Sequence, residues 1–371
     1  MNVKIQTSKL REGLNKILTV IDRKNSRPIL TNNLVILNDT NLELIATDLE
    51  VTAKVILPAQ VNGSGKFCIN TKNLFDILRE LPDEELTLEV ESEGGLLKLN
   101  CQKINYSLLI SNPDEYPQVS FGDTSNSISL SSKNLLNIIA KTSHAISNDE
   151  TRINLNGIYL QNIESKLRAV AIDGHRLALL DILDFNYDNH ALKDGIIIPK
   201  KGIGELKKLA ESNLDGEIKI NIDESFIYAN SNDEYFLSVR LIAREYPKYQ
   251  TVIPSKTTHT LLIEKNIFYN AVKRIKLLSN EKTNGIKCSF SSSELLITAD
   301  HPSLGQAKES IQVEYDGPEM EIGFNARYMI DALSILDVNE IIFEFNNELS
   351  PVIIRSNEEE NFLGIIMPLK I

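Results

Sequence analysis

The chain has 371 residues, and 42% of them are hydrophobic, so it is long enough to form two or three packed domains. Its formal net charge of -12 at pH 7 argues against a simple basic DNA-binding module, because affinity for phosphate comes from lysine and arginine. An acidic chain can still act on DNA if its cations gather on one surface or if it is attached topologically. The chain contains no apolar run of about 18 residues, and its N-terminal segment lacks an apolar signal core, so we expect a cytoplasmic protein without a transmembrane helix.

The sequence lacks the patterns that commonly carry catalysis or cofactors. No GxxxxGK[ST] phosphate loop, no GxGxxG after a strand and no HExxH motif is present. Cys68, Cys101 and Cys288 have no metal-binding or redox spacing, and we expect them to be buried free thiols. The acidic runs 83–85 and 358–360 fall in predicted loops, where solvated charge is the expected role and weak binding of Mg²⁺ is the alternative. We therefore predict no cofactor, no metal and no enzymatic activity.

A threefold internal repeat dominates the sequence. Segments that begin at Val3, Ser127 and His259 each predict a short strand, a polar break and an amphipathic helix. Each is followed by an apolar strand that ends in an aspartate, at residues 42–48, 167–173 and 295–300. These aspartates, Asp48, Asp173 and Asp300, recur at intervals of 125 and 127 residues, and each predicts an acidic turn.

The second half of each repeat is also regular. Helices are predicted from Thr71, Lys200 and Asn325. Each is followed by a strand in which apolar and polar residues alternate, which is typical of an antiparallel sheet with one solvent-exposed face. Closing strands begin at Ile104, Tyr235 and Asn361. Segments 113–126 and 246–258 are rich in Pro, Ser and Thr and read as linkers between domains. We predict an α+β fold with three repeated domains, each with two helices and antiparallel sheets, at residues 1–122, 123–254 and 255–371.

Three similar units in a row form either an open array or a closed ring. Contact between the free edges of the first and third units would close two chains into a ring of six units. An unpaired edge strand is an aggregation hazard, which favours pairing.

Beyond this pattern, the chain resembles the beta sliding clamps of bacterial DNA polymerase III over essentially its whole length. The resemblance is carried by short strings in the same order, of which DGHRLA and the terminal Met-Pro are the most specific. The strings are RPILTNNL at 27–34, ATDLE at 46–50, LNG at 155–157, IDGHRLAL at 172–179, IPKKG at 198–202, REYPKY at 244–249, LLSNEK at 277–282, EMEIGFNARY at 319–328 and the C-terminal MPLKI.

The resemblance implies a non-catalytic processivity factor. It would be a head-to-tail homodimer that forms a ring, with helices lining a hole through which double-stranded DNA runs. An ATP-driven clamp loader would open one interface. The DNA polymerase III catalytic subunit, other polymerases and repair proteins would bind through short peptides.

Cations on the predicted helices and on the loops beside them are the candidates for contact with DNA. Lys24, Arg152 and the pair Lys200–Lys201 match DNA-facing positions of the family, and the second helix of the first repeat adds Lys72 and Arg79. Loose contacts with the phosphate backbone, without readout of bases, would let a ring slide. The alternative is that these residues lie on ordinary solvated helix faces.

The resemblance also implies a pocket for partner peptides. Apolar walls with a methionine accommodate varied anchors, and a few polar groups fix orientation. The matched positions are Leu155, Ile172, Gly174, His175, Arg176, Leu177, Pro247, Val252, Asn325, Tyr328, Leu349, Pro351, Ile365, Met367, Pro368 and Leu369.

The pocket assignment has alternatives and departures from the family. His175 is otherwise a turn residue, or a catalytic base without a visible partner, and Met367–Pro368 is otherwise a frayed tail. Thr251 and Thr283 stand where better-studied relatives carry larger side chains, and the last three residues, 369–371, keep the family pattern with different residues. Peptide preference is therefore expected to differ.

A dimer interface is implied at the two ends of the chain. Tyr106 and Leu108 on the first closing strand would meet Arg274, Leu277 and Leu278, which end the first helix of the third repeat. The alternative is that the leucines belong to the core of their own domain.

Two other classes of protein stay open at this point. A hydrolase or nuclease would need clustered carboxylates or a nucleophile beside a base, whereas each repeat offers one turn aspartate. A generic repeat scaffold without a role on DNA would be an open monomeric array.

Overall fold

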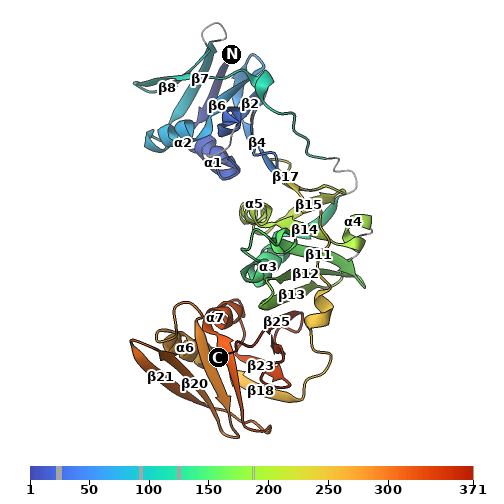
Figure 1. The fold of residues 1–371 in the computed structure, drawn as a ribbon. Helices are drawn as coiled ribbons and strands as arrows, with labels where there is room; N and C mark the ends of the chain where they lie inside the picture. The colour runs from blue at the N-terminus through green and yellow to red at the C-terminus, as the bar shows by residue number, and fades with distance from the viewer. Residues whose placement is uncertain (22–26, 92–94, 123–126, 186, 188, 371) are drawn as a thin grey trace. The chain divides into compact units, whose positions relative to one another are not determined.

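The computed structural model describes residues 1–21, 27–91, 95–122, 127–185, 187 and 189–370 (Figure 1). It divides into two compact units. Unit 1 contains Met1–Leu136 and Lys201–Leu241, and unit 2 contains Asn137–Lys200 and Ile242–Ile371. Residues 123–254, the predicted central domain, therefore contribute to both units.

Unit 1 contains two helices from the first repeat and most of one from the second. Helix α1 (Thr7–Ile17) buries Leu10, Leu14 and Ile17 on one face, which is the helical periodicity seen in the sequence. Helix α2 (Thr71–Glu80) begins at Asn70, whose side chain accepts a hydrogen bond from the Asn73 N–H at 3.0 Å. Helix α5 (Lys200–Glu211) continues from unit 2 into unit 1.

Two sheets complete unit 1. One has five strands in the order β5 (Gln60–Asn62), β1 (Asn2–Gln6), β7 (Glu85–Glu91), β8 (Leu96–Cys101) and β9 (Ile104–Leu109). The other has the order β10 (Ile128–Ser131), β15 (Glu217–Ile222), β16 (Phe226–Ser231), β17 (Tyr235–Arg240), β4 (Val51–Pro58), β3 (Asn41–Thr47), β2 (Asn32–Asn38) and β6 (Gly65–Asn70). Strands β4 and β17 pair from Val51↔Val239 to Val55↔Tyr235, so one sheet joins the first two repeats.

Unit 2 repeats this plan with the third repeat. Helix α3 (Ser132–Thr142) runs into it from unit 1, and α4 (His190–Asp194) is a short helix beside β11. Helix α6 (Lys265–Lys276) buries Phe268, Ala271, Val272 and Ile275. Helix α7 (Ala326–Ser334) packs against α6.

The sheets of unit 2 are again antiparallel. The larger has the order β14 (Ile196–Pro199), β11 (Gly157–Ile163), β12 (Lys166–Ile172), β13 (Arg176–Ile182), β25 (Phe362–Ile366), β24 (Val352–Arg355), β23 (Glu340–Phe345) and β18 (His259–Glu264). The smaller has the order β21 (Gly305–Gln312), β20 (Glu294–His301), β19 (Gly285–Phe290) and β22 (Met320–Asn325). Pairing of β13 with β25 joins the second and third repeats in the same way as β17 and β4 join the first two.

The predicted helices and antiparallel strands are confirmed, with one error. Asp48 and Asp173 lie in turns, but Asp300 lies inside β20, where it pairs with Gln306 of β21. The chain turns only after His301, because Gly305, with φ of +104°, closes the hairpin. The expected acidic turn of the third repeat is therefore wrong.

The two segments predicted as linkers are not purely loop. Segment 113–122 contains the short η2 turn (Pro113–Glu115) and the buried Tyr116, whose hydroxyl donates to the Ile45 carbonyl at 3.2 Å. In 246–258, Tyr246 stacks on Tyr159 with ring centroids 4.6 Å apart. Buried aromatic side chains thus fix both segments to the domains beside them.

Candidate functional site

The candidate peptide-binding residues all lie in unit 2, and the tight turn between β12 and β13 organises them. The Asp173 carboxylate accepts the backbone N–H groups of His175 at 2.8 Å and Arg176 at 3.0 Å. Gly174 has φ of +93°, a left-handed conformation that glycine adopts at low cost. The sequence Asp-Gly-His-Arg therefore sets the direction of the next two side chains.

Arg176 is held on three sides. Its Nε donates to Asp173 Oδ2 at 3.0 Å, and its Nη1 donates to Asp331 Oδ2, on α7, at 2.6 Å. The guanidinium lies over the Tyr328 ring, 4.4 Å from the centroid. Arg176 has 10% of its side chain exposed and is held in place. Together with Tyr328 and Asp331 it forms one side of the candidate peptide pocket, which we call the Arg176 wall.

Helix α7 begins at this wall. The Asn325 side chain accepts the N–H groups of Arg327 at 2.9 Å and Tyr328 at 3.3 Å, and it donates to the Thr283 carbonyl at 3.0 Å. The rings of His175 and Tyr328 are stacked, with centroids 6.0 Å apart. Asn325, Tyr328 and His175, named from the sequence, are thus brought together.

The C-terminal tail runs along the same wall. The Met367 N–H donates to the His175 carbonyl at 2.8 Å, and the Leu369 N–H donates to the Gly323 carbonyl at 2.8 Å. These bonds hold residues 367–369, including Pro368, against the turn before β13 and against β22, so the alternative of a frayed tail does not apply there.

The apolar residues among the candidate peptide-binding residues form the base of the candidate pocket. Leu155 on η4 (Ile153–Leu155), Leu177 and Ile365 belong to one buried cluster, and Ile172 and Val252 pack against it. Leu177 and Ile365 face each other across the β13–β25 pair. Pro247, Leu349 and Pro351 lie on the connections that precede η5 (Tyr249–Val252) and β24, and Leu349 is 73% exposed.

A histidine lies behind the wall and was not singled out from the sequence. Burial and the nearby Arg176 guanidinium lower the pKa of His144 to about 4, against opposing effects of Asp331 and Asp173. Its Nδ1 is buried and has no hydrogen-bond partner in the described part of the chain. His144 is therefore neutral at physiological pH.

The candidate DNA-facing cations differ in their surroundings. Lys72 pairs with Asp76 one helical turn away, and Arg79 is exposed near the end of α2. The Lys200 ammonium donates to the Asn148 side chain at 2.6 Å. Arg152 pairs with Asp149 at 2.9 Å, and its guanidinium lies 2.9 Å from where a side chain on Gly174 would begin. Arg152 thus lies next to Gly174, one of the candidate peptide-binding residues. Lys24 lies outside the described residues.

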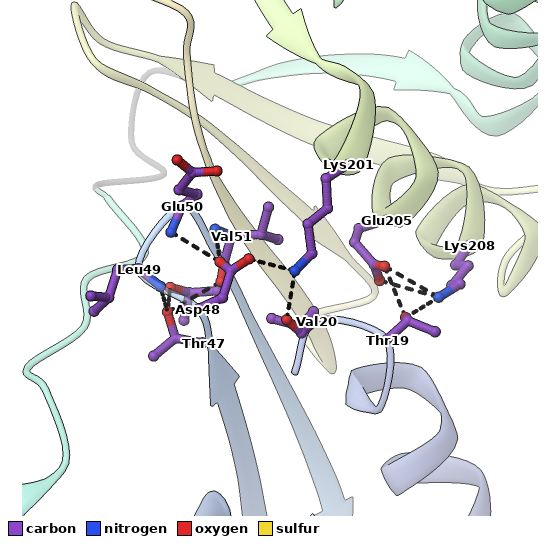
Figure 2. Close-up of polar contacts among 11 residues, drawn as sticks. Thr19, Val20, Thr47, Asp48, Leu49, Glu50, Val51, Lys201, Glu205 and Lys208 are labelled. Carbon is purple, nitrogen blue, oxygen red and sulfur yellow. Dashed lines mark hydrogen bonds and ion pairs between the residues drawn. The ribbon is translucent and has the colours of Figure 1, made fainter. Parts of the chain in front are cut away.

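Lys201 makes structural contacts within unit 1. Its ammonium donates to the Asp48 carboxylate and, at 2.8 Å, to the Val20 carbonyl, as Figure 2 shows. The same Asp48 carboxylate accepts the N–H groups of Glu50 at 3.0 Å and Val51 at 2.7 Å. A phosphate group would therefore have to compete with Asp48 for Lys201.

A second contact of the same kind lies one turn along α5. The buried Glu205 carboxylate accepts the Thr19 hydroxyl at 2.8 Å and pairs with Lys208 at 3.2 Å (Figure 2). Together with Lys201, these groups connect α5 of the second repeat to the first repeat. Sequence periodicity gives no signal for this cross-repeat network, which joins residues 153 to 189 positions apart.

The candidate interface residues lie on the edge strand β9 and at the C-terminal end of α6. Tyr106 and Leu108 are on β9, an edge strand, where Tyr106 is 36% exposed and Leu108 is half-buried. Leu277, after α6, is 78% exposed, so the alternative of a core residue is wrong for it, whereas Leu278 is half-buried.

Arg274, the other candidate in unit 2, pairs with Glu309 of the edge strand β21 at 2.5 Å. The sequence prediction missed three exposed apolar side chains near these edges. Ile104 and Leu109 lie on β9, and Leu304 lies in the β20–β21 turn. Their proximity to a predicted closing strand and to a hairpin was the available signal.

The three cysteines are buried and free, as expected, and burial raises the pKa of the Cys288 thiol to about 12. Within the described ranges, no three His, Cys, Asp or Glu side chains gather in a way that would hold a metal ion. The helices of the described chain include none that is long and apolar enough to span a membrane.

Fold and site together define a three-domain clamp-type protein with a recognition wall. Family profiles for the DNA polymerase III beta subunit match the chain in order: the N-terminal domain at residues 1–120, the central domain at 129–248 and the C-terminal domain at 250–370. The chain therefore belongs to the bacterial DNA polymerase III beta subunits, the beta sliding clamps, which are the non-catalytic processivity subunits of that polymerase.

Individual relatives agree over full length. The chain is 31% identical to the beta sliding clamp of Pseudomonas aeruginosa and 30% identical to that of Caulobacter vibrioides, with 100% of both chains covered in each case. Its structure is similar to the P. aeruginosa DNA polymerase III subunit beta, with a TM-score of 0.93, 29% identity and full coverage of both chains. A sliding clamp from Bartonella birtlesii bound to griselimycin gives a TM-score of 0.94 with 29% identity and full coverage of both. The predicted family, fold class and processivity function are confirmed.

Proposed function

We propose that two copies of this chain associate head to tail into a ring around double-stranded DNA. The ring would hold DNA polymerase III and other replication and repair proteins on the duplex through peptides bound in unit 2. Each chain would contribute three domains, at 1–122, 123–254 and 255–371. The protein would work in the cytoplasm, and a clamp loader would open one interface with ATP that the loader hydrolyses.

The observation that carries the dimer is the apolar surface beside two free strand edges. Strand β9 ends one sheet of unit 1 and exposes 82% of Leu109, and β21 ends one sheet of unit 2 near Leu277 and Leu304. Unpaired edges with apolar side chains favour association with another edge. Pairing of β9 with β21 of a second copy would cover both and would bring Tyr106 and Leu108 towards Arg274 and Leu278.

Attachment to DNA would be topological, since the net charge of -12 opposes adhesion to phosphate. Lys24, Lys72, Arg79, Arg152, Lys200 and Lys201 would make loose contacts with the backbone. Those already paired with carboxylates, such as Lys72 and Lys201, would add little affinity. Such weak contacts are compatible with sliding.

The peptide pocket would use the Arg176 wall for orientation and the Leu155–Leu177–Ile365 cluster for an apolar anchor. A fixed guanidinium over a tyrosine ring is preorganised, which lowers the entropic cost of binding. Met367 beside His175 adds an adaptable apolar contact.

The decisive experiment compares retention on circular and linear DNA. In one measurement, light scattering gives the mass of the free protein in solution. In the other, the protein is loaded onto a nicked circular duplex with a clamp loader and ATP. We expect a dimer that stays on the circle in high salt and is lost when the duplex is cut. A monomer, or rapid loss from the intact circle at low salt, would contradict the ring.

A further inference from the structure

A groove lies in unit 2 beside the end of the C-terminal tail. It has a volume of about 740 Å³ and is lined by parts of β19, β20 and β21, the loop before β19, and Leu369 and Lys370. Of the residues matched to the peptide pocket, Leu369 alone lines it, and Thr283, the carbonyl partner of Asn325, lines it as well. We call it the flank groove and ask what chemistry it offers.

The groove floor carries two lysines on either side of a threonine, in a row across the sheet. Lys287 on β19 faces Thr298 on β20, and Thr298 faces Lys308 on β21, so all three side chains are on one face. Neighbours Ile286 and Ile297 are buried, which places α6 and the core on the opposite face. The row therefore points away from the core.

Charge in the groove is unbalanced. Lys287 pairs with Glu321 at 3.1 Å, and Asp300 accepts the Gln306 amide at 2.8 Å. Lys308 and Lys370 are exposed, and among the described residues neither has a carboxylate within ion-pair distance. Asp300 keeps its negative charge, because its partner is a neutral amide. The groove therefore presents two lysines, Lys308 and Lys370, against one carboxylate that no ion pair of the described residues neutralises, and its net charge is positive.

The groove is continuous with the proposed peptide pocket. Leu369 belongs to both, and the Thr283 carbonyl that accepts from Asn325 is on the loop at the groove edge. The floor is open there because residue 285 is glycine: a Cβ would lie 3.3 Å from the Thr283 hydroxyl and 3.4 Å from Leu369 Cδ2.

We propose that the flank groove binds acidic residues next to the anchor motif of a partner peptide, with Lys308 and Lys370 pairing with their carboxylates. This inference rests on the peptide pocket proposed above. From β19 to β21 the sheet spans two strand spacings, about 10 Å, which about three residues of extended peptide would cover. The apolar anchor would bind in the pocket, and the acidic flank would give selectivity among partners.

Binding of matched peptides tests the proposal. The probe is the clamp-binding segment of the DNA polymerase III catalytic subunit, labelled with a fluorophore and extended by three Asp residues on its N-terminal or C-terminal side. Versions with three Asn residues in the same places are the neutral controls, and anisotropy gives Kd. The protein variants are K308Q, K370Q and the double substitution.

We expect one Asp-flanked peptide to bind the wild type more tightly than its Asn-flanked control. Each lysine substitution should reduce this advantage by about two- to fivefold, as for exposed ion pairs, and salt should reduce it too. K273Q is the matched control, because Lys273 is exposed on α6, which packs against the other face of this sheet. It should leave the advantage unchanged.

Other outcomes would separate the two proposals. Equal affinity of the Asp-flanked and Asn-flanked peptides for the wild type, or an advantage that survives the double substitution, would overturn the flank groove alone. If neither the Asp-flanked nor the Asn-flanked peptides bound, the peptide pocket itself would be refuted, and this inference with it.

Discussion

Arg176 and Asp331 are joined by a 2.6 Å hydrogen bond between β13 and α7, although they are 155 residues apart in the sequence. The bond ties the second repeat to the third at the wall of the proposed peptide pocket. Tyr328 lies one helical turn before Asp331 and under the Arg176 guanidinium, so the three side chains hold each other in place.

Removal of the Asp331 charge tests this wall. D331N should weaken binding of the polymerase peptide by about tenfold, because a hydrogen bond to a charged group contributes about 1.5 kcal/mol. Titration of a labelled peptide measures the effect, and circular dichroism confirms the fold. D337N, on an exposed residue just after α7, is the control. Equal affinities of the two variants would show that Asp331 does not position Arg176.

The dimer prediction depends on Leu277. L277D places a charge on a side chain that is 78% exposed, so the isolated chain should remain folded. In the dimer the same charge would be buried in the proposed interface with the second copy, and association should weaken. Sedimentation should show a dimer dissociation constant raised by about 100-fold or more. The control is L214D, at a leucine 54% exposed in unit 1 away from β9. A stable L277D dimer would place the interface elsewhere.

His144 predicts a pH dependence of stability. Its pKa is about 4 in the folded chain, below the ordinary 6.5, so the unfolded chain binds the proton first. The stabilisation is present above pH 6.5 and is lost as the pH falls towards 4. Between pH 7 and 5 this residue should account for a loss of about 1–2 kcal/mol.

Urea unfolding at pH 7 and pH 5 measures this loss. In H144Q the part that belongs to His144 should disappear, while losses from carboxylates remain. Identical pH dependence in the wild type and the variant would refute the assignment.

The tail prediction separates binding from folding. Deletion of residues 367–371 removes the backbone bonds to His175 and Gly323, and it should abolish peptide binding without dissociating the dimer. A shorter deletion of residues 370–371 keeps both bonds. Fluorescence titration should then show that the neutral Asn-flanked peptide still binds. Unchanged affinity after the longer deletion would rule out this pocket.

Substitution of Lys201 tests whether this residue stabilises the fold or contacts DNA. Asp48 has 10% of its side chain exposed, so K201Q should destabilise the chain by about 1–2 kcal/mol, because the carboxylate keeps its two backbone N–H donors but loses the Lys201 ammonium. A double-mutant cycle with D48N, read by chemical unfolding, isolates the pair. If K201Q instead left stability unchanged and lowered the salt dependence of DNA contact, Lys201 would face the duplex.

Local sequence patterns predicted the helices and strands. Features that depend on contacts between distant parts of the sequence could not be predicted in this way. Helices at 7–17 and 265–276 follow from apolar spacing alone, and the position of Asn325 before α7 follows from its capping chemistry. Asp300 was misplaced because strand pairing with β21 extends β20 past the residue that would turn. Asp331 has no local signal, since its importance depends on Arg176, which lies 155 residues away in the sequence.

The pairing of β4 with β17 also has a consequence during synthesis. Strand β4 is complete at residue 58, but its partner begins at residue 235. At roughly 5–20 residues per second, the ribosome needs about 10–35 s to deliver that partner. Throughout that time the nascent chain carries an unpaired apolar edge, a target for chaperones or for a neighbouring nascent chain.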